Sequence, residues 1–214
     1  MNLRAEISRQ FRPLRNVFIF LQIPAGLILL LVLFLKLRFD IDTSDLTQDP
    51  NSISGQPFYI GLISNFGIIF WGASAAVSIF AGWIGKSKTP SVESFLIYSG
   101  IYSALLLLDD LLQLHEGFFQ YGLRIPEELV LAVYSLLAAA IFFRHRKIIP
   151  ASNYFILLAS LMLFGFSLVV DTFFGGIPGE NLLEDGAKFI GILTWFGYYT
   201  SLGFESIKGK ISKA

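Results

Sequence analysis

Long runs without a charged residue divide this chain into six apolar segments. The runs cover residues 16–35, 50–85, 94–108, 129–143, 148–170 and 189–204. A helix that spans the hydrocarbon of a membrane needs about 20 apolar residues, and none of the runs alternates polar and apolar residues as a barrel strand would. The pattern therefore predicts an all-α polytopic membrane protein, a bundle of six transmembrane helices.

Turn-forming and charged residues at the ends of the runs set the expected limits of each helix. We predict helices over residues 17–37, 58–84, 94–114, 127–143, 151–173 and 184–204, within a transmembrane domain of residues 16–207. Apolar residues at helical spacing predict that residues 1–15 lie along the membrane surface as an amphipathic segment. Residues 208–214 are expected to form a basic cytoplasmic tail.

Small side chains recur on one face of the second predicted helix. Ser74, Ser78 and Gly82 stand four residues apart, so they share a face of the helix. Small residues let the backbones of two membrane helices approach closely. We therefore expect this face to pack against a neighbouring helix rather than to bind a ligand.

The 16 basic and 16 acidic residues cancel in number, but they are separated along the chain. One set of loops, which includes both termini, holds twelve basic and three acidic residues, whereas the alternate set holds four basic and thirteen acidic residues. Because Lys and Arg accumulate in cytoplasmic loops, both termini are predicted to be cytoplasmic, in a bacterial cytoplasmic membrane. The zero net charge argues against a nucleic-acid partner, and the lack of Cys excludes disulfides and thiolate zinc sites.

Three aspartates on the acidic side have no explanation in helix structure. Acidic residues at 127–128 and 184–185 open their predicted helices, where the helix dipole stabilises negative charge. Asp109, Asp110 and Asp171 instead lie near the C-terminal ends of helices, where the dipole disfavours it. If the third helix continues past Leu108, the first two are buried and must be neutralised by protonation, by Lys188 or Arg124, or by a cation. If that helix ends at Leu108, both are in water.

These acids suggest a metal site. On a helix that continues past Leu112, Asp109, Gln113 and Glu116 share one face, and His115 points elsewhere. If the two acidic hairpins face each other, the predicted metal ligands are Asp109, Asp110, Glu116, Asp171, Glu184 and Asp185. Nearby supporting groups are Gln113, His115, Lys188 and Tyr198. Six carboxylates with at most one imidazole favour a hard cation, Ca²⁺, Mg²⁺ or Mn²⁺.

Three classes of function agree with this pattern. The first is a transporter-like membrane protein that binds a divalent cation or protons at the outer carboxylate cluster. The second is a metal-assisted enzyme that acts on lipid at the outer leaflet, where a metal would activate water. The third is a structural or assembly subunit that contacts the lipid bilayer and a membrane protein partner or a second copy of itself.

Overall fold

The computed structural model describes residues 18–85, 90–174, 176 and 178–209, and these residues contain helices and loops but no strand. The prediction of an all-α protein is thus confirmed for the described part of the chain. Two compact units are present, Met1–Ile60 and Gly61–Ala214. The predicted amphipathic segment 1–15 and residues 210–214 of the predicted tail lie outside the described residues.

The first unit is built around one apolar helix. After a π-helical turn, Phe18–Gln22, come α2 (Ile23–Phe39), α3 (Thr43–Thr47) and α4 (Pro50–Ile53). No residue of α2 is buried, although most of its side chains are apolar. A helix that exposes apolar side chains on every side is typical of one surrounded by lipid or by other membrane helices.

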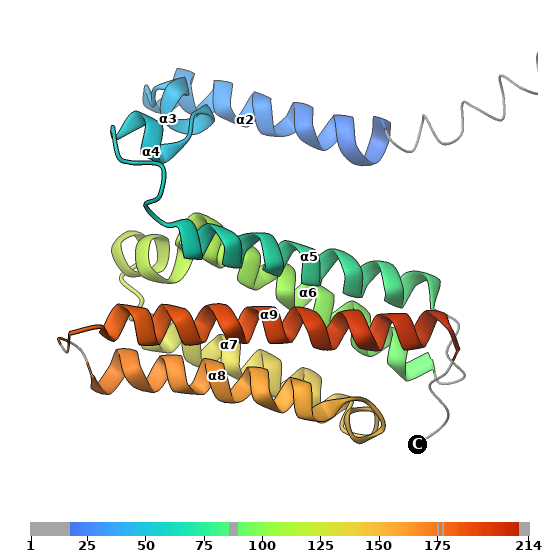
Figure 1. Cartoon of the computed structure of the whole chain (residues 1–214). Helices are drawn as coiled ribbons and strands as arrows, with labels where there is room; N and C mark the ends of the chain where they lie inside the picture. The colour runs from blue at the N-terminus through green and yellow to red at the C-terminus, as the bar shows by residue number, and fades with distance from the viewer. Residues whose placement is uncertain (1–17, 86–89, 175, 177, 210–214) are drawn as a thin grey trace, which may run out of the picture. The chain divides into compact units, whose positions relative to one another are not determined.

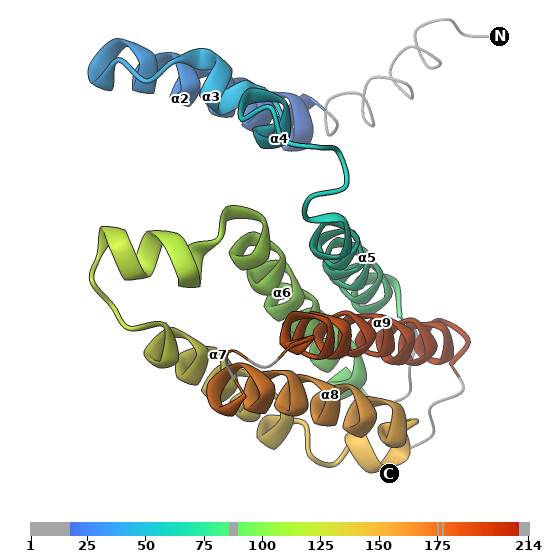
Figure 2. The ribbon, with the colours of Figure 1, turned by 60° about the vertical axis from the view of Figure 1, so that its left-hand side comes forward.

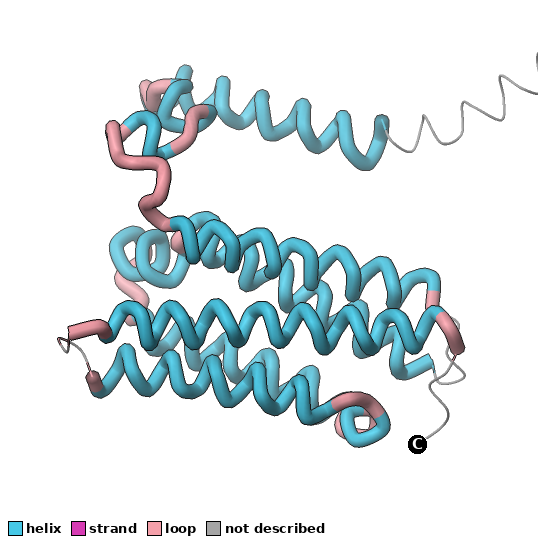
Figure 3. The backbone as a smooth tube through the Cα atoms, viewed as in Figure 1, coloured by secondary structure: helices cyan, strands magenta, loops and turns pink. Residues whose placement is uncertain are grey.

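The described residues of the second unit form five longer helices and two short connecting helices (Figures 1 and 2). They are α5 (Leu62–Ile84), α6 (Pro90–Leu112), η2 (Leu114–Gly122), α7 (Glu127–Arg144), η3 (Ile149–Ala151), α8 (Tyr154–Phe173) and α9 (Glu180–Ile207). The loops are confined to the ends of the helices, as Figure 3 shows. The C-terminal ends of α6 and α8 and the N-terminal ends of α7 and α9 therefore meet at one end of this unit (Figure 1).

Helix α9 begins earlier than the sequence pattern predicts. Its first residue is Glu180, which follows Gly179 in the left-handed conformation at φ 88°. Glu184 and Asp185 therefore lie beyond the first turn, where the helix dipole acts weakly. Their charges are not explained by the start of the helix, contrary to the sequence-based interpretation.

Aromatic residues fill the core of the second unit. Tyr198, Tyr199 and Trp195 of α9 are almost completely buried and pack with Trp71 of α5 and Phe95 of α6. Rings of this size bury a large apolar area and supply much of the packing energy. Helix α9 lies at the centre because it packs extensively against both α5 and α8.

The outer surfaces of these helices are apolar as well. Among the residues that the structure describes, three helical segments are long and apolar enough to cross a membrane, Leu62–Ile84, Ser91–Leu112 and Tyr154–Phe173. Large side chains such as Trp83, Phe155 and Met162 are exposed on the outside, Trp83 to 82%. A soluble protein rarely exposes so continuous an apolar surface, so these features agree with association with a membrane.

Helices α5 and α6 pack closely through small residues. Ser74, Ser78 and Gly82 are all buried, which confirms that this face of α5 packs against neighbouring helices. A Cβ atom added at Gly82 would lie 2.7 Å from Cγ1 of Ile97. Gly100 of α6 approaches α5 just as closely, since a Cβ atom there would lie 2.6 Å from Cγ1 of Ile79.

We expect Gly100→Ala to lower the free energy of unfolding by about 1–3 kcal/mol, the usual effect of overpacking. The matched control is Gly197→Ala on α9, where an added Cβ meets no atom within 4 Å. Thermal unfolding of both variants in the same detergent measures the effect. An equal melting temperature for Gly100→Ala and wild type would contradict the close approach of α5 and α6.

Candidate metal centre

An interruption of the helix after α6 positions the candidate site. The helix ends at Leu112, and Gln113 adopts the left-handed conformation, with φ 49° and ψ 47°. The π-helix η2 follows and turns the chain back, so His115 contacts Asp109 of α6. The prediction that His115 points elsewhere was therefore wrong, because it assumed an uninterrupted helix.

Asp109 is buried and all its contacts are internal. Its side chain is 4% exposed. Oδ1 accepts hydrogen bonds from the Tyr134 hydroxyl of α7 at 2.8 Å and from the backbone N–H of His115 at 3.1 Å. Oδ2 forms an ion pair with Nδ1 of His115. This carboxylate thus holds the imidazole ring in place and joins α6 to η2 and α7.

The neighbouring carboxylate, Asp110, is held by a different pair of helices. Oδ2 accepts a hydrogen bond from Nε1 of Trp71 on α5 at 2.9 Å, and Oδ1 pairs with Nζ of Lys188 on α9 at 3.0 Å. The side chain of Asp110 is only 12% exposed. Both aspartates therefore lie inside the protein rather than in water, and Lys188 neutralises the second of them.

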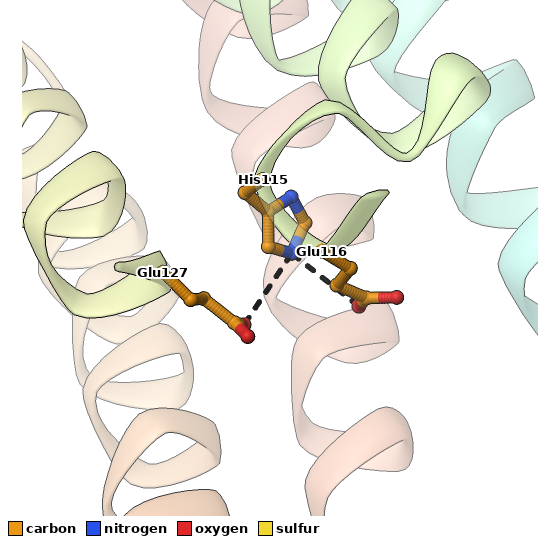
Figure 4. A group of neighbouring side chains, drawn as sticks. All are labelled: His115, Glu116 and Glu127. Carbon is orange, nitrogen blue, oxygen red and sulfur yellow. Dashed lines mark ion pairs between the residues drawn. The ribbon is translucent and has the colours of Figure 1, made fainter. Parts of the chain in front are cut away.

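The second ring nitrogen of His115 faces two glutamates (Figure 4). Nε2 lies 3.4 Å from Oε1 of Glu116 and 3.9 Å from Oε1 of Glu127, the first residue of α7. One candidate ligand atom from each of the three residues lies within 4.8 Å of the others. Metal bonds to such atoms are about 2.0–2.2 Å long, so two ligands of one ion are at most about 4.4 Å apart. Small side-chain movements would let all three bind one cation.

The electrostatic environment of His115 favours a positive charge at this position. The adjacent Asp109 carboxylate raises the pKa of His115 above the usual 6.5, and burial of the ring acts in the opposite direction. The charge of Glu116 adds to the upward shift of the pKa. An ion bound at Nε2 would supply the positive charge that these carboxylates favour.

A cavity of about 650 Å³ adjoins the three residues. Helices α5 to α9 and η2 all contribute to its walls. Charged side chains lie at the end where α6 meets η2, whereas farther along α7 the wall consists largely of apolar residues such as Leu131, Ala138 and Phe142. The volume is in the range of sites that bind small molecules, which are commonly about 300–1,000 Å³.

Comparison with known proteins identifies the family of the chain. Residues 23–202 match the model of a family described as a domain of unknown function, DUF8692. The chain belongs to the DUF8692 family. No curated protein and no solved structure gives a match. The DUF8692 region includes the whole candidate metal centre.

Within the DUF8692 region, the structure brings most of the predicted site residues to the cavity. Its lining includes Asp109, Asp110, His115, Glu116, Asp171, Glu184 and Lys188. Of the predicted ligands, only Glu116 belongs to the group that can hold a metal, and His115, expected as a supporting group, belongs to it too. Asp109 and Asp110 are instead engaged by internal partners.

Three predicted residues of the DUF8692 region lie elsewhere. Asp185 follows Glu184 on α9, so it points about 100° away around the helix, and it does not line the cavity. The side chain of Gln113 is exposed at the left-handed turn. The hydroxyl of Tyr198 lies 2.8 Å from Oγ of Ser152. Ser152 precedes the N-terminal end of α8, whereas the candidate site is at the C-terminal end of that helix.

Sequence reasoning missed three residues of the DUF8692 site. Glu127 was assigned to the start of α7, where it does lie, but its carboxylate also faces His115. Tyr134 and Trp71 donate hydrogen bonds to the two aspartates. The one signal in the sequence was the presence of two adjacent acidic residues at the start of α7, where one carboxylate is enough to interact favourably with the helix dipole.

Proposed function

We propose that this protein is an integral membrane protein with six spans and both termini in the cytoplasm of a bacterium. Support for membrane insertion comes from three long apolar helices and from the apolar α2, in which no residue is buried. The orientation rests on the separation of charge, twelve basic and three acidic residues against four and thirteen. It places the candidate metal centre on the outer side.

The orientation is testable because the chain has no Cys. Gln120 in η2 and Lys147 beyond α7 are both exposed and lie on opposite predicted sides. A membrane-impermeant maleimide added to intact cells should label Gln120→Cys and leave Lys147→Cys unlabelled until the cells are opened. The reverse pattern would overturn the proposed orientation.

We further propose that the protein binds a divalent cation through His115, Glu116 and Glu127. The observation that carries this proposal is the pairing of His115 Nδ1 with the buried Asp109, which leaves Nε2 directed at two glutamates. A carboxylate behind a histidine ligand commonly fixes the ring and strengthens it as a donor. One nitrogen and several carboxylate oxygens suit Mn²⁺ best among the hard cations expected from the sequence.

The distribution of polar residues favours binding and chemistry over transport. The charged side chains of the cavity gather at one end, and the remaining wall is largely apolar. A path for an ion would need polar groups along its length, because a bare charge in an apolar medium is costly. A metal beside an apolar cavity instead suits a metal-assisted reaction on a lipid, in which the ion activates water or polarises a carbonyl oxygen.

Metal analysis of detergent-purified protein tests the cation site. We expect close to one Mn²⁺ per chain after dialysis against Mn²⁺, and a higher melting temperature that falls again when a chelator removes the ion. Mg²⁺, Ca²⁺ and Zn²⁺ serve as competitors. If none of the four ions changes the melting temperature and no metal is retained, cation binding is wrong, and stable copurification with one partner would then favour an assembly role.

A further inference from the structure

The cavity lies along α7, and we refer to it as the slot. In the described part of the chain, α7 packs against α6 and η2 but barely approaches α8 or α9, and the cavity occupies the space between them. Its lining on α7 extends from Glu127 to Phe142. At about 1.5 Å per residue, these positions are about 22 Å apart along the helix. The slot is long enough for an extended aliphatic chain.

Away from the charged residues, the slot is lined by aromatic rings. The centroid of the Trp195 ring lies 6.2 Å from those of Phe142 and Phe164. Ala138 and Ala139 contribute only methyl groups to the wall along α7 and so leave space beside the helix. Burial of a hydrocarbon chain here would contribute about 0.8 kcal/mol for each CH₂ group removed from water.

The polar end of the slot carries excess negative charge. Two of its carboxylates are already paired, Asp109 with His115 and Asp110 with Lys188. Glu116 and Glu127 face the candidate metal site. The two others, Asp171 at the end of α8 and Glu184 on α9, form no ion pair with another described residue.

These last two carboxylates both line the cavity. Asp171 is close enough for its charge to interact with those of both Glu184 and Glu127. Even with a divalent cation bound by Glu116 and Glu127, this end of the slot keeps a negative potential. Such a surface attracts a cationic group and repels an anionic one.

We propose that the cavity binds an amphiphile with a single aliphatic chain and an amine head group. The chain lies in the slot along α7, and the ammonium group lies at the polar end, where Asp171 and Glu184 neutralise it. This binding goes beyond the proposed cation site and does not depend on it. A fatty acid is disfavoured by the same carboxylates, and a neutral chain lacks the attraction of the head group.

Tryptophan fluorescence provides a direct test. Trp71 and Trp195 line the cavity, whereas Trp83 is exposed on the outside, so the Trp83→Phe variant reports on the cavity alone. Dodecylamine with a bromine on its last carbon should quench this fluorescence saturably, because bromine quenches at short range. The matched probes are the alcohol of the same length and a brominated butylamine, which test the head group and the chain.

We expect the amine to bind at least about tenfold more tightly than the alcohol, as one charged contact would give, and the butylamine to bind far more weakly. Asp171→Asn combined with Glu184→Gln should remove the preference for the amine. Ala139→Phe should abolish saturable quenching by filling the slot, with Ala138→Phe as a second blocking variant if the first fails to fold. Melting temperatures of all variants confirm folding.

Titrations with Mn²⁺ and with a chelator separate this proposal from the cation site. Amine binding that persists in the chelator supports the slot whatever the fate of the metal. Equal quenching by the amine and the alcohol overturns the proposed head group. Unchanged quenching in the folded Ala139→Phe and Ala138→Phe variants, or a copurified membrane helix that occupies the slot, overturns the proposal as a whole.

Discussion

Replacing His115 with alanine is expected to abolish stabilisation of the protein by Mn²⁺. This side chain supplies the single nitrogen ligand of the candidate centre, and its Nε2 is the atom that both Glu116 and Glu127 face. Asp109→Asn should have a smaller effect, about 10–100-fold in affinity, which is typical of the loss of a group behind a metal ligand. Equilibrium dialysis measures both affinities, and the loss in His115→Ala should exceed that in Asp109→Asn.

The start of α7 offers a matched pair of controls for this experiment. Glu127→Gln should weaken Mn²⁺ binding, because Glu127 belongs to the group that can hold the ion. Glu128→Gln removes the next carboxylate along the same helix, and this side chain is exposed and does not line the cavity. Equal effects of the two substitutions would show that only the general negative charge of this region attracts the ion.

Replacing Lys188 with methionine is expected to lower the free energy of unfolding by about 3 kcal/mol. The change leaves the carboxylate of Asp110 without its counter-charge, and loss of one partner of a buried ion pair costs about 3–5 kcal/mol. We expect the lower end of this range because the Lys188 side chain is 38% exposed. Unfolding in detergent, followed by circular dichroism, measures the loss.

A second substitution separates the charge from the packing. Asp110→Asn in the Lys188→Met background should recover part of the stability, because the amide oxygen still accepts the hydrogen bond from Trp71 and residue 110 no longer carries an unpaired charge. Lys36→Met is the matched control, since Lys36 pairs with the exposed Asp40 and an ion pair in water contributes little to stability. Equal losses from Lys188→Met and Lys36→Met would contradict a buried pair.

The sequence predicted the helices well because apolar runs reflect burial in lipid or in the core. Each of the six runs overlaps one of the longer helices, α2 and α5 to α9, and all of these helices except α5 extend beyond their run. The small-residue face of α5 could also be predicted, since its spacing alone places Ser74, Ser78 and Gly82 together. The predicted first residues of the helices were less accurate. Apolar patterns do not report a left-handed residue such as Gly179, which allows α9 to begin at Glu180.

The sequence indicated which part of the chain holds the candidate site, but not which side chains contact each other there. The helix-dipole argument correctly showed that Asp109 and Asp110 need partners, and it included Lys188 among them. It could not assign His115 to Asp109, because that contact depends on a left-handed Gln113 and a π-helix, neither of which has a sequence signature here. A residue such as Glu127 can also serve the helix start and the site at once, so one explanation concealed the other.

The two adjacent aspartates have a consequence for the rotational register of α6. Asp109 contacts η2 and α7, and Asp110 contacts α5 and α9, so neighbouring residues fix two directions about 100° apart around one helix. A single-residue insertion or deletion between Gly100 and Asp109 would rotate both carboxylates away from their partners at once. The C-terminal half of α6 is therefore expected to tolerate many apolar substitutions but no insertion or deletion.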